Sequence, residues 1–212
     1  EAGPSSRIRF PEHGPYNNRL GYSRLPTMVE GLTGRHFEVT EQAEMSIPMA
    51  LTMDLGLYPV YRHKDQAGLE ILGHRQRALF ALQYPGRAYT DPDSIPDMVW
   101  KSLLFIENRD LLDRSQAYQN PAVEWDRFAA AAAQRVITGG EGPGGSTLAT
   151  QLTKVRHSPG GRTTSIPEKL RQMASASLLA YRNGMETLGE RKHIVKEYLN
   201  QLPLAATANH GE

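Results

Sequence analysis

The sequence contains no cysteine in its 212 residues. Disulfide bonds and thiol chemistry are therefore excluded, and cysteine usage leaves the cellular compartment open. No run approaches the ~18 consecutive apolar residues that a membrane-spanning helix needs. The sequence also has no excess of charge of one sign, because its 24 lysine and arginine residues are balanced by 23 aspartate and glutamate residues. With a formal net charge of +1, the chain has no overall positive field that would favour nucleic acid as a partner.

Several chemical signatures are missing as well. Histidine, aspartate and glutamate show no cluster with metal-ligand spacing, so we expect no structural metal site. The S-x-x-K pattern of an acyl-transferring serine is absent, which excludes a penicillin-binding transpeptidase within these residues. The chain begins with the polar stretch EAGPSSRIRF and ends with LAATANHGE directly after a helical pattern. From these two ends we expect a piece of a longer protein.

The most unusual stretch present is GGEGPGGSTLATQLTK, residues 139–154, in which a glycine-rich loop runs directly into a helical pattern. Glycine allows positive φ and lets main-chain N–H groups converge on a ligand. Ser146 is a good helix N-cap, and the unpaired N–H groups of the helix it would open favour an anion. No lysine precedes Ser146, which excludes a nucleotide loop of the GxxxxGK[ST] type. Two interpretations stay open: an anion-binding loop, or a mobile surface connection before a capped helix.

A basic segment follows the loop, with the acid Glu168 as its one negative charge between residues 154 and 171. Its cations are Lys154, Arg156, Arg162, Lys169 and Arg171. Local positive charge of this kind favours a phosphate-bearing substrate. The alternative is a solvated helix face. Arg171 lies on a different helix face from Lys169, and we expect it to be in solvent.

The pattern along the chain predicts a mainly α protein with a small β appendage. Residues 1–60 are typical of an irregular arm, with short strands or one helix near Gln42–Leu51. Apolar and polar residues alternate on both sides of GHRQ, residues 73–76, which predicts a β-hairpin. We place a domain boundary after this hairpin. The N-terminal arm then covers residues 1–85, and a helical domain, incomplete at its C-terminal end, covers residues 86–212.

Five helices are predicted in the second domain from periodicity and capping signals. Ser94 is the expected N-cap of the first helix, and residues 123–138 form the second. The third runs from Ser146 to about Val155, the fourth opens with a capping box at Ser165 and Glu168, and the fifth covers residues 191–202. The residues expected to face the core are Ile95, Val99, Leu103 and Ile106 in the first helix, Leu170, Met173, Ser177 or Leu178, and Tyr181 in the fourth, and Ile194, Val195, Tyr198, Leu199 and Leu202 in the fifth.

Four stretches, in the right order, resemble the motifs of the bacterial peptidoglycan glycosyltransferases of glycosyltransferase family 51. FIENRDLLDRSQ resembles EDxxFxxHxG and supplies Glu107, and GGSTLATQLTK resembles GGSTITQQLxK. EKLRQ resembles RKxxE and supplies Lys169, and RKHIVKEYLN resembles KxxILxxYLN. The resemblance runs from Tyr84 to Asn200.

The chain departs from these motifs in ways that bear on activity. Smaller departures occur at Arg114, Gln116, Ala149, Thr150 and Arg191. The most serious is Gln172, which stands where the family has a second glutamate. An amide can donate and accept hydrogen bonds, but it carries neither a charge nor a titrating proton. The chain is therefore similar to a divergent member of the family or to a weakened enzyme.

The resemblance implies a lysozyme-like α-helical fold and the polymerisation of lipid II, a sugar carried on polyprenyl pyrophosphate. It implies lipid II, the nascent glycan strand, the membrane surface and further domains of a longer chain as partners, and no nucleic acid. The implied location is the outer face of the bacterial inner membrane, on its periplasmic side, with the anchor outside these residues. It implies no particular cofactor. A Mg²⁺ ion bound to the pyrophosphate of the substrate is compatible with this, because such an ion needs no ligand motif in the protein sequence.

The resemblance also implies roles for particular residues. Glu107 is the expected catalytic base, and burial beside Ile106 would raise its pKa towards neutrality; taken alone, an ordinary acid at a helix end explains it as well. The expected substrate-binding residues are Ser146, Thr147, Gln151, Lys154, Arg162, Lys169 and Gln172. The lysines and the arginine among them suit pyrophosphate oxygens, and the two hydroxyl residues would hold substrate rather than act as nucleophiles. Lys169 and Gln172 stand one helical turn apart and are expected to face the same cleft.

Two other functions stay open. Gln172 favours a non-catalytic module that binds lipid II or nascent glycan. A lysozyme-like, glycan-cleaving enzyme would use Glu107 as an acid of raised pKa, but it gives no reason for the basic segment. Glu168 is a possible replacement for the missing glutamate, but the predicted capping box already accounts for it.

Overall fold

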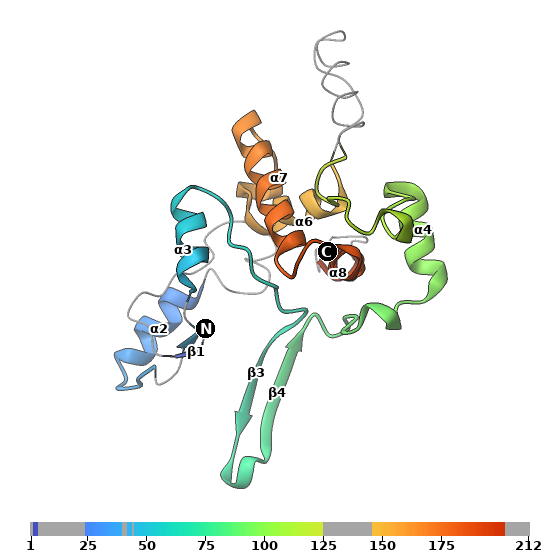
Figure 1. The fold of residues 1–212 in the computed structure, drawn as a ribbon. Coiled ribbons are helices and arrows are strands. Elements are labelled where there is room, and N and C mark those ends of the chain that lie inside the picture. The colour runs from blue at the N-terminus through green and yellow to red at the C-terminus, as the bar shows by residue number, and fades with distance from the viewer. Residues whose placement is uncertain (1, 4–23, 40–41, 44, 125–145, 202–212) are drawn as a thin grey trace.

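A computed structural model describes residues 2–3, 24–39, 42–43, 45–124 and 146–201. It is mainly helical, and a two-stranded hairpin projects from the helical body (Figure 1). The expected fold class, mainly α with a small β appendage, is confirmed. The glycine-rich loop, Leu202 and all but the first two residues of the helix predicted over residues 123–138 lie outside the described residues. In the described part of the chain, no helix is long and apolar enough to cross a membrane.

The N-terminal arm contributes two helices and two very short strands. Strand β1 (Ala2–Gly3) pairs antiparallel with β2 (Gln42–Ala43). Helix α2 (Leu25–Thr33) was not predicted, and α3 (Ile47–Asp54) overlaps the helix expected near Gln42–Leu51. Neither helix contains a buried residue, so the hydrophobic core lies elsewhere.

The predicted hairpin is confirmed. Strand β3 (Ala67–Leu72) pairs antiparallel with β4 (Ala78–Tyr84). The 3-10 turn η2 (His74–Gln76) joins them, and both Arg75 and Gln76 have positive φ there. The expected alternation of apolar and polar residues holds only in part, because β4 contains the apolar run ALFAL and the ladder shifts its register between Ile71 and Leu72.

Four described α-helices and three 3-10 turns form the helical domain. The helices are α4 (Asp97–Glu107), α6 (Leu148–His157), α7 (Ile166–Tyr181) and α8 (Leu188–Gln201). The turns are η3 (Pro92–Ser94), η4 (Arg114–Gln116) and η5 (Pro159–Gly161). Helix α6 packs against both α7 and α8 and therefore lies at the centre of the domain.

Helix α4 differs from the prediction at its start and on its buried side. It begins at Asp97, because Ser94 belongs to the separate turn η3 and does not cap it. Ile95 is buried as expected, but Ile106 is 78% exposed. Leu104 is the buried residue of the helix. The predicted apolar stripe was therefore wrong at its C-terminal end.

The N-caps of α6 and α7 show one wrong prediction and one correct one. Ser146 was expected to cap α6, but Thr147 is the cap, and its hydroxyl accepts the N–H of Thr150 at 3.3 Å. Ser165 caps α7 as predicted, accepting the N–H of Glu168 at 3.3 Å. Side-chain capping of this kind satisfies an N–H group that the helix itself leaves unpaired.

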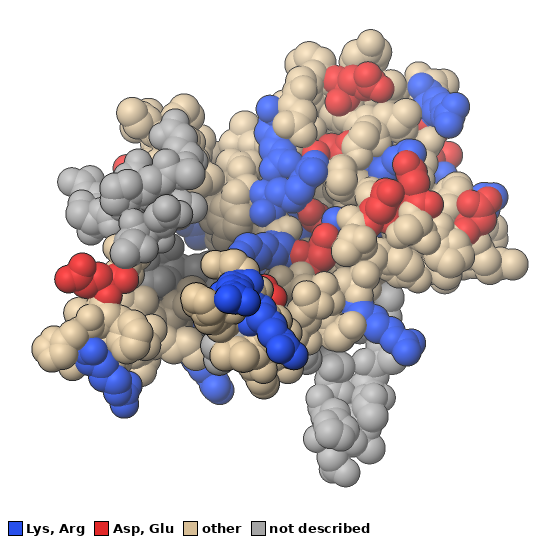
Figure 2. All heavy atoms as spheres, turned by 90° about the horizontal axis from the view of Figure 1, so that it is seen from below, with Lys and Arg blue, Asp and Glu red and all other residues tan. Residues whose placement is uncertain are grey.

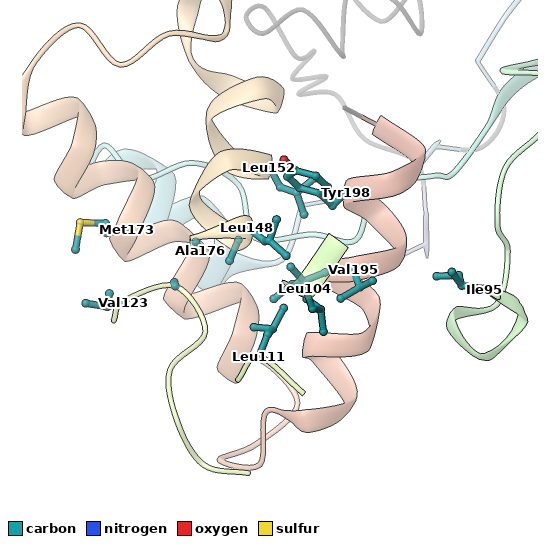
Figure 3. Close-up of a cluster of buried hydrophobic side chains, with 13 residues drawn as sticks. Ile95, Leu104, Leu111, Val123, Leu148, Leu152, Met173, Ala176, Val195 and Tyr198 are labelled. Carbon is teal, nitrogen blue, oxygen red and sulfur yellow. The ribbon is translucent and has the colours of Figure 1, made fainter. Parts of the chain in front are cut away.

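The hydrophobic core lies where α6, α7 and α8 meet, with α4 and the segment after it closing one side (Figure 3). Its labelled members are Ile95, Leu104, Leu111, Val123, Leu148, Leu152, Met173, Ala176, Val195 and Tyr198. The prediction for α8 is confirmed at Ile194, Val195 and Tyr198, whereas Leu170 and Leu178 of α7 are exposed. Buried polar and charged side chains are as numerous as buried apolar ones among the described residues. The interior therefore depends on paired polar groups as well as on apolar burial.

Two residues of α8 tie distant segments to the helical domain. Arg191 is 1% exposed and donates to main-chain oxygens of the segment after α4, at 3.3 Å to Leu111 and 2.7 Å to Gln119. A planar guanidinium with five donors suits several carbonyls at once, which a lysine ammonium does less well. Asn200 exchanges hydrogen bonds with the main chain of Tyr89, donating at 2.8 Å and accepting at 2.9 Å. These contacts fix the chain on both sides of α4.

Candidate active site

Glu107 is the last residue of α4 and is half-buried. Its Oε2 accepts a hydrogen bond from Nε2 of Gln151 on α6 at 3.1 Å. Oε1 of the same glutamine accepts the hydroxyl of Tyr198 on α8 at 3.2 Å. The chain of contacts brings together residues from three of the four stretches singled out in the sequence.

The Tyr198 hydroxyl orients the Gln151 amide. Burial and then the negative charge of Glu107 raise the pKa of Tyr198, so this phenol stays protonated and donates at neutral pH. The donation fixes which end of the amide faces Glu107. Sequence reasoning assigned Tyr198 to the core alone and missed this role, although the tyrosine stands inside the fourth motif stretch.

A cationic contact also lies at the start of α6. Nζ of Lys169, on α7, donates to Oγ of Ser146 at 2.6 Å. Ser146 directly precedes the N-cap of α6, and Gln151 lies in the helix's first turn. A carboxylate and an ammonium group are thus held at neighbouring points around one helix start.

Thr147 serves the fold at this point. It is buried, and besides capping α6 its hydroxyl donates to the main-chain oxygen of Ala122 at 3.3 Å. This contact links the segment after α4 to the start of α6. The structure therefore gives Thr147 a positioning role, and its contact with substrate stays a prediction.

The other predicted cations are less enclosed. Lys154 is half-buried and lies three residues after Gln151 on α6, so the two occupy neighbouring helix faces. Arg162 is exposed and lies between η5 and α7. Their convergence with Lys169 on one cleft beside Glu107 stays a prediction.

Gln172 was expected to face the same cleft as Lys169. This prediction is wrong, because Gln172 is fully buried. Its Nε2 donates to Oγ of Ser158 at 2.8 Å, and its Oε1 accepts the hydroxyl of Thr163 at 3.0 Å. The Ser158 hydroxyl donates its own proton to Glu168 at 2.5 Å. Because the Ser158 hydroxyl donates its only proton to Glu168, it can only accept a hydrogen bond from residue 172. The amide N–H of Gln172 supplies that hydrogen bond, which an ionised carboxylate could not.

Glu168 has a further partner in the N-terminal arm. Its main-chain N–H is capped by Ser165, but its carboxylate accepts from the hydroxyls of Ser158 and Tyr58. Burial raises the pKa of Glu168, but the hydrogen bonds from Ser158, Tyr58 and Gln172 together hold it below its ordinary value. The second half of the predicted capping box is therefore absent, and this carboxylate fastens the arm to α7.

Tyr58 docks the end of the arm onto α7. It is buried, and its main-chain N–H donates to Oγ of Ser175 at 2.9 Å. Arg171 lies over the Tyr58 ring, 4.6 Å from its centroid, and donates to the main-chain oxygen of Gly56. The expectation that Arg171 lies in solvent was wrong, because the arm supplies its partners.

Two buried histidines complete this contact. The ring of His157, at the end of α6, stacks on Tyr58 at 5.0 Å and lies 5.3 Å from the ring of His63. Burial lowers the pKa of His157 to about 3, and the charges of Arg156 and Arg171 act in the same direction. Burial, followed by Arg156 and His157, also holds the pKa of His63 well below its ordinary value. Both imidazoles are neutral in the folded protein at pH 7.

Two further observations concern binding sites elsewhere in the described residues. A cavity between α6, α7 and α8 has a volume of about 10 Å³, which is roughly the space for one water molecule and not for a sugar. Across the described ranges, no group of three or more histidine, aspartate or glutamate residues is placed to hold a metal ion. The start of α6, beside Glu107 and Lys169, is the candidate active site.

Comparisons with known proteins agree with the motif stretches. The transglycosylase family matches the chain over residues 75–211, about two thirds of its length. The match begins inside the hairpin turn, ahead of the boundary predicted after residue 85. A comparison with curated proteins finds no match.

We predict that Gln172→Glu destabilises the fold at pH 7 by about 1–3 kcal/mol. The new carboxylate would be enclosed beside Glu168, whose Oε1 lies 3.5 Å from the present amide nitrogen, and Ser158 would lose its donor. These surroundings raise the folded-state pKa of the new acid, so the stability lost at pH 7 returns as pH falls towards about 4.

Urea denaturation of the wild type and the variant at pH 7 and pH 5 measures this effect. Gln172→Met is the matched control, because it removes the donor without adding a charge and should cost the same at both pH values. A Gln172→Glu protein as stable as the wild type at pH 7 would contradict the hydrogen-bond directions described here.

The buried His157 predicts a loss of stability in mild acid. Its pKa is lower when folded than when unfolded, so the contribution is complete above about pH 6.5 and decreases as pH falls towards 3. By pH 5 the loss amounts to about 2 kcal/mol. In His157→Phe the slope of stability against pH should be shallower than in the wild type, whereas His74→Gln in the exposed hairpin turn should keep it. Equal slopes for wild type and His157→Phe would show that another group causes the acid sensitivity.

Proposed function

The chain belongs to the transglycosylase family, and we propose that it polymerises the glycan strands of peptidoglycan from lipid II. Family membership itself makes it a glycosyltransferase of peptidoglycan synthesis. In the proposed reaction the 4-hydroxyl of an acceptor disaccharide attacks the anomeric carbon of the lipid-linked donor. The new C–O bond forms as the bond to pyrophosphate breaks, the configuration inverts, and polyprenyl pyrophosphate leaves. The proton of the attacking hydroxyl passes to a base on the enzyme.

Glu107 is the base in this proposal. Its contact with Gln151 is the observation that carries the proposal, because it joins the carboxylate to residues of the second and fourth motif stretches. An ionised carboxylate only accepts hydrogen bonds. A donor amide held in place by Tyr198 therefore orients Glu107 while leaving it suited to accept a proton.

Lys169 is the proposed partner of the leaving pyrophosphate. Negative charge grows on the bridging oxygen as the bond breaks, and a fixed cation stabilises it. Ser146 holds the lysine ammonium at 2.6 Å, at the end of the glycine-rich loop. Lys154 and Arg162 are proposed to contact the other phosphate oxygens, which both residue types suit. A Mg²⁺ ion would bind through those oxygens rather than through a protein cage.

The proposed partners and location follow from the substrate. Lipid II and the nascent glycan strand are the proposed ligands, and the outer face of the bacterial inner membrane is the proposed location. A non-catalytic module that binds lipid II is the second candidate, favoured by Gln172, whose enclosed amide cannot act as an acid or base. Incubating the protein with labelled lipid II and separating the products on a gel distinguishes the two, since a binding module yields no polymer.

Glu107→Gln should lower polymerisation at least a hundredfold, in line with the ~10²–10⁴ that a positioned base contributes. Fold and lipid II binding should be retained, because glutamine keeps the size of the side chain and its hydrogen-bonding ability. The matched control is Glu186→Gln, which removes an exposed acid before α8 and should leave the rate unchanged. Retention of more than about a tenth of the activity would remove Glu107 from this role.

Lys169→Met should lower the polymerisation rate about 10²–10³-fold, because it removes charge stabilisation from the leaving group. Ser146→Ala keeps the ammonium group and loses one hydrogen bond, so the rate should fall by no more than about tenfold. Thermal unfolding of both variants checks that the fold is intact. If Lys169→Met is no slower than Ser146→Ala, the lysine does not serve the leaving group.

A further inference from the structure

We propose that the β3–β4 hairpin is a membrane-binding element that inserts its apolar side chains into the interface of an anionic lipid bilayer. The hairpin projects away from the helices (Figure 1), and its second strand is rich in exposed apolar residues. Leu79 is 70%, Phe80 48% and Leu82 58% exposed. A concentration of exposed apolar surface of this kind marks an interaction site.

The apolar side chains point to both faces of the hairpin. Successive residues of a strand face opposite sides, so Phe80 and Leu82 share one face and Leu79 lies on the other. The register pairs Phe80 with Ile71 and Leu82 with Leu69. A protein partner would cover one face of a two-stranded sheet, whereas a lipid interface surrounds both. This distribution favours lipid.

The charge of the hairpin fits an anionic surface. The hairpin's cations are Arg75 and Arg77, which flank Gln76 at the turn, and its one acid, Glu70, lies on β3. Figure 2 shows the molecule from below, the direction in which the hairpin projects in Figure 1. Each cation near an anionic membrane strengthens binding about fivefold, and long cationic side chains reach the head groups while their stems stay in apolar surroundings.

The base of the hairpin is fixed to the helix that carries Tyr198. Nε2 of Gln66 donates to the main-chain oxygen of Pro85 at 2.7 Å, which closes the base. Directly before β3, Asp65 pairs with Lys196 of α8 at 2.7 Å. A hairpin seated in a bilayer would therefore hold the helical domain at a set height above the membrane.

The role that we give to membrane binding, which is to hold the active site beside a lipid-linked substrate, rests on the proposed function. Its test needs no substrate. The chain is mixed with vesicles of phosphatidylcholine alone or with phosphatidylglycerol added, and the bound fraction is measured by flotation. The wild type should bind the anionic vesicles more tightly, and the difference should decrease as salt is added.

Two hairpin variants separate the apolar and the charge contributions. Phe80→Ser with Leu82→Ser should weaken binding to both kinds of vesicle at least tenfold, roughly the transfer of two partly buried side chains. Arg75→Gln with Arg77→Gln should weaken binding to anionic vesicles about 25-fold and change binding to neutral vesicles little. The matched control, Lys101→Gln with Lys192→Gln, removes the same charge from cations that pair with Asp97 and Asp93 and should bind nearly as the wild type does.

A fluorescent label provides an independent measurement, since the chain has no cysteine of its own. An environment-sensitive dye on Ala78→Cys, at the start of β4, should brighten with anionic vesicles. The same dye on Ser102→Cys, exposed on α4, should not. Circular dichroism of each variant verifies the fold.

Two outcomes would overturn the proposal. One is vesicle binding that the Phe80 and Leu82 variant leaves unchanged. The other is no vesicle binding by the wild type; self-association in analytical ultracentrifugation that the same variant abolishes would then assign the hairpin to contact with a second copy of the chain. In either case the polymerisation assay on lipid II in detergent still tests the proposed function separately.

Discussion

Helix α8 must keep its charged side chains paired inside the protein, and the described structure is arranged around those pairs. Glu197 lies 2.7 Å from Arg156 of α6, with both side chains almost fully buried. Arg191 holds the segment after α4, and Lys196 holds Asp65 at the base of the hairpin. Removing one partner of a buried pair leaves an unpaired charge and costs about 3–5 kcal/mol. The positions of α4, α6 and the hairpin are therefore set together by one helix.

The candidate active site follows from the same arrangement. Tyr198 belongs to the apolar core through its ring, and its hydroxyl orients Gln151 towards Glu107. A single residue of α8 thus links packing to the direction of a hydrogen bond at the proposed base. The fourth motif stretch therefore combines two kinds of residue. Its apolar residues pack into the core, whereas Tyr198 and Asn200 form hydrogen bonds that hold Gln151 and the main chain of Tyr89 in position.

The features that the sequence predicted well are those with local causes. The hairpin has two β-type runs on either side of a short turn, Ser165 directly precedes a helix with proline in its first turn, and the buried side of α8 has a clear period. Errors arose where local signals were ambiguous: Ser146 and Thr147 both carry a capping hydroxyl, and a shift of two positions separates Ile106 from Leu104 as the inward-facing residue of α4. The distant partners of Arg171 and Glu168 could not be predicted, because Gly56 and Tyr58 are more than 100 residues away in the chain.

The departure from the family motif at Gln172 and the docking of the N-terminal arm belong together. The enclosed space around Ser158 holds one carboxylate, Glu168, and one amide, Gln172, with the hydrogen-bond directions already set between them. The Tyr58 hydroxyl supplies another donor to that carboxylate, from a segment that precedes the family match at residue 75. A glutamate at position 172 would place two negative charges where donors are already committed, and their repulsion would raise the pKa of one of them. The polar interior of the helical domain thus extends back to Gly56, and the amide at position 172 is the residue type that this packing requires.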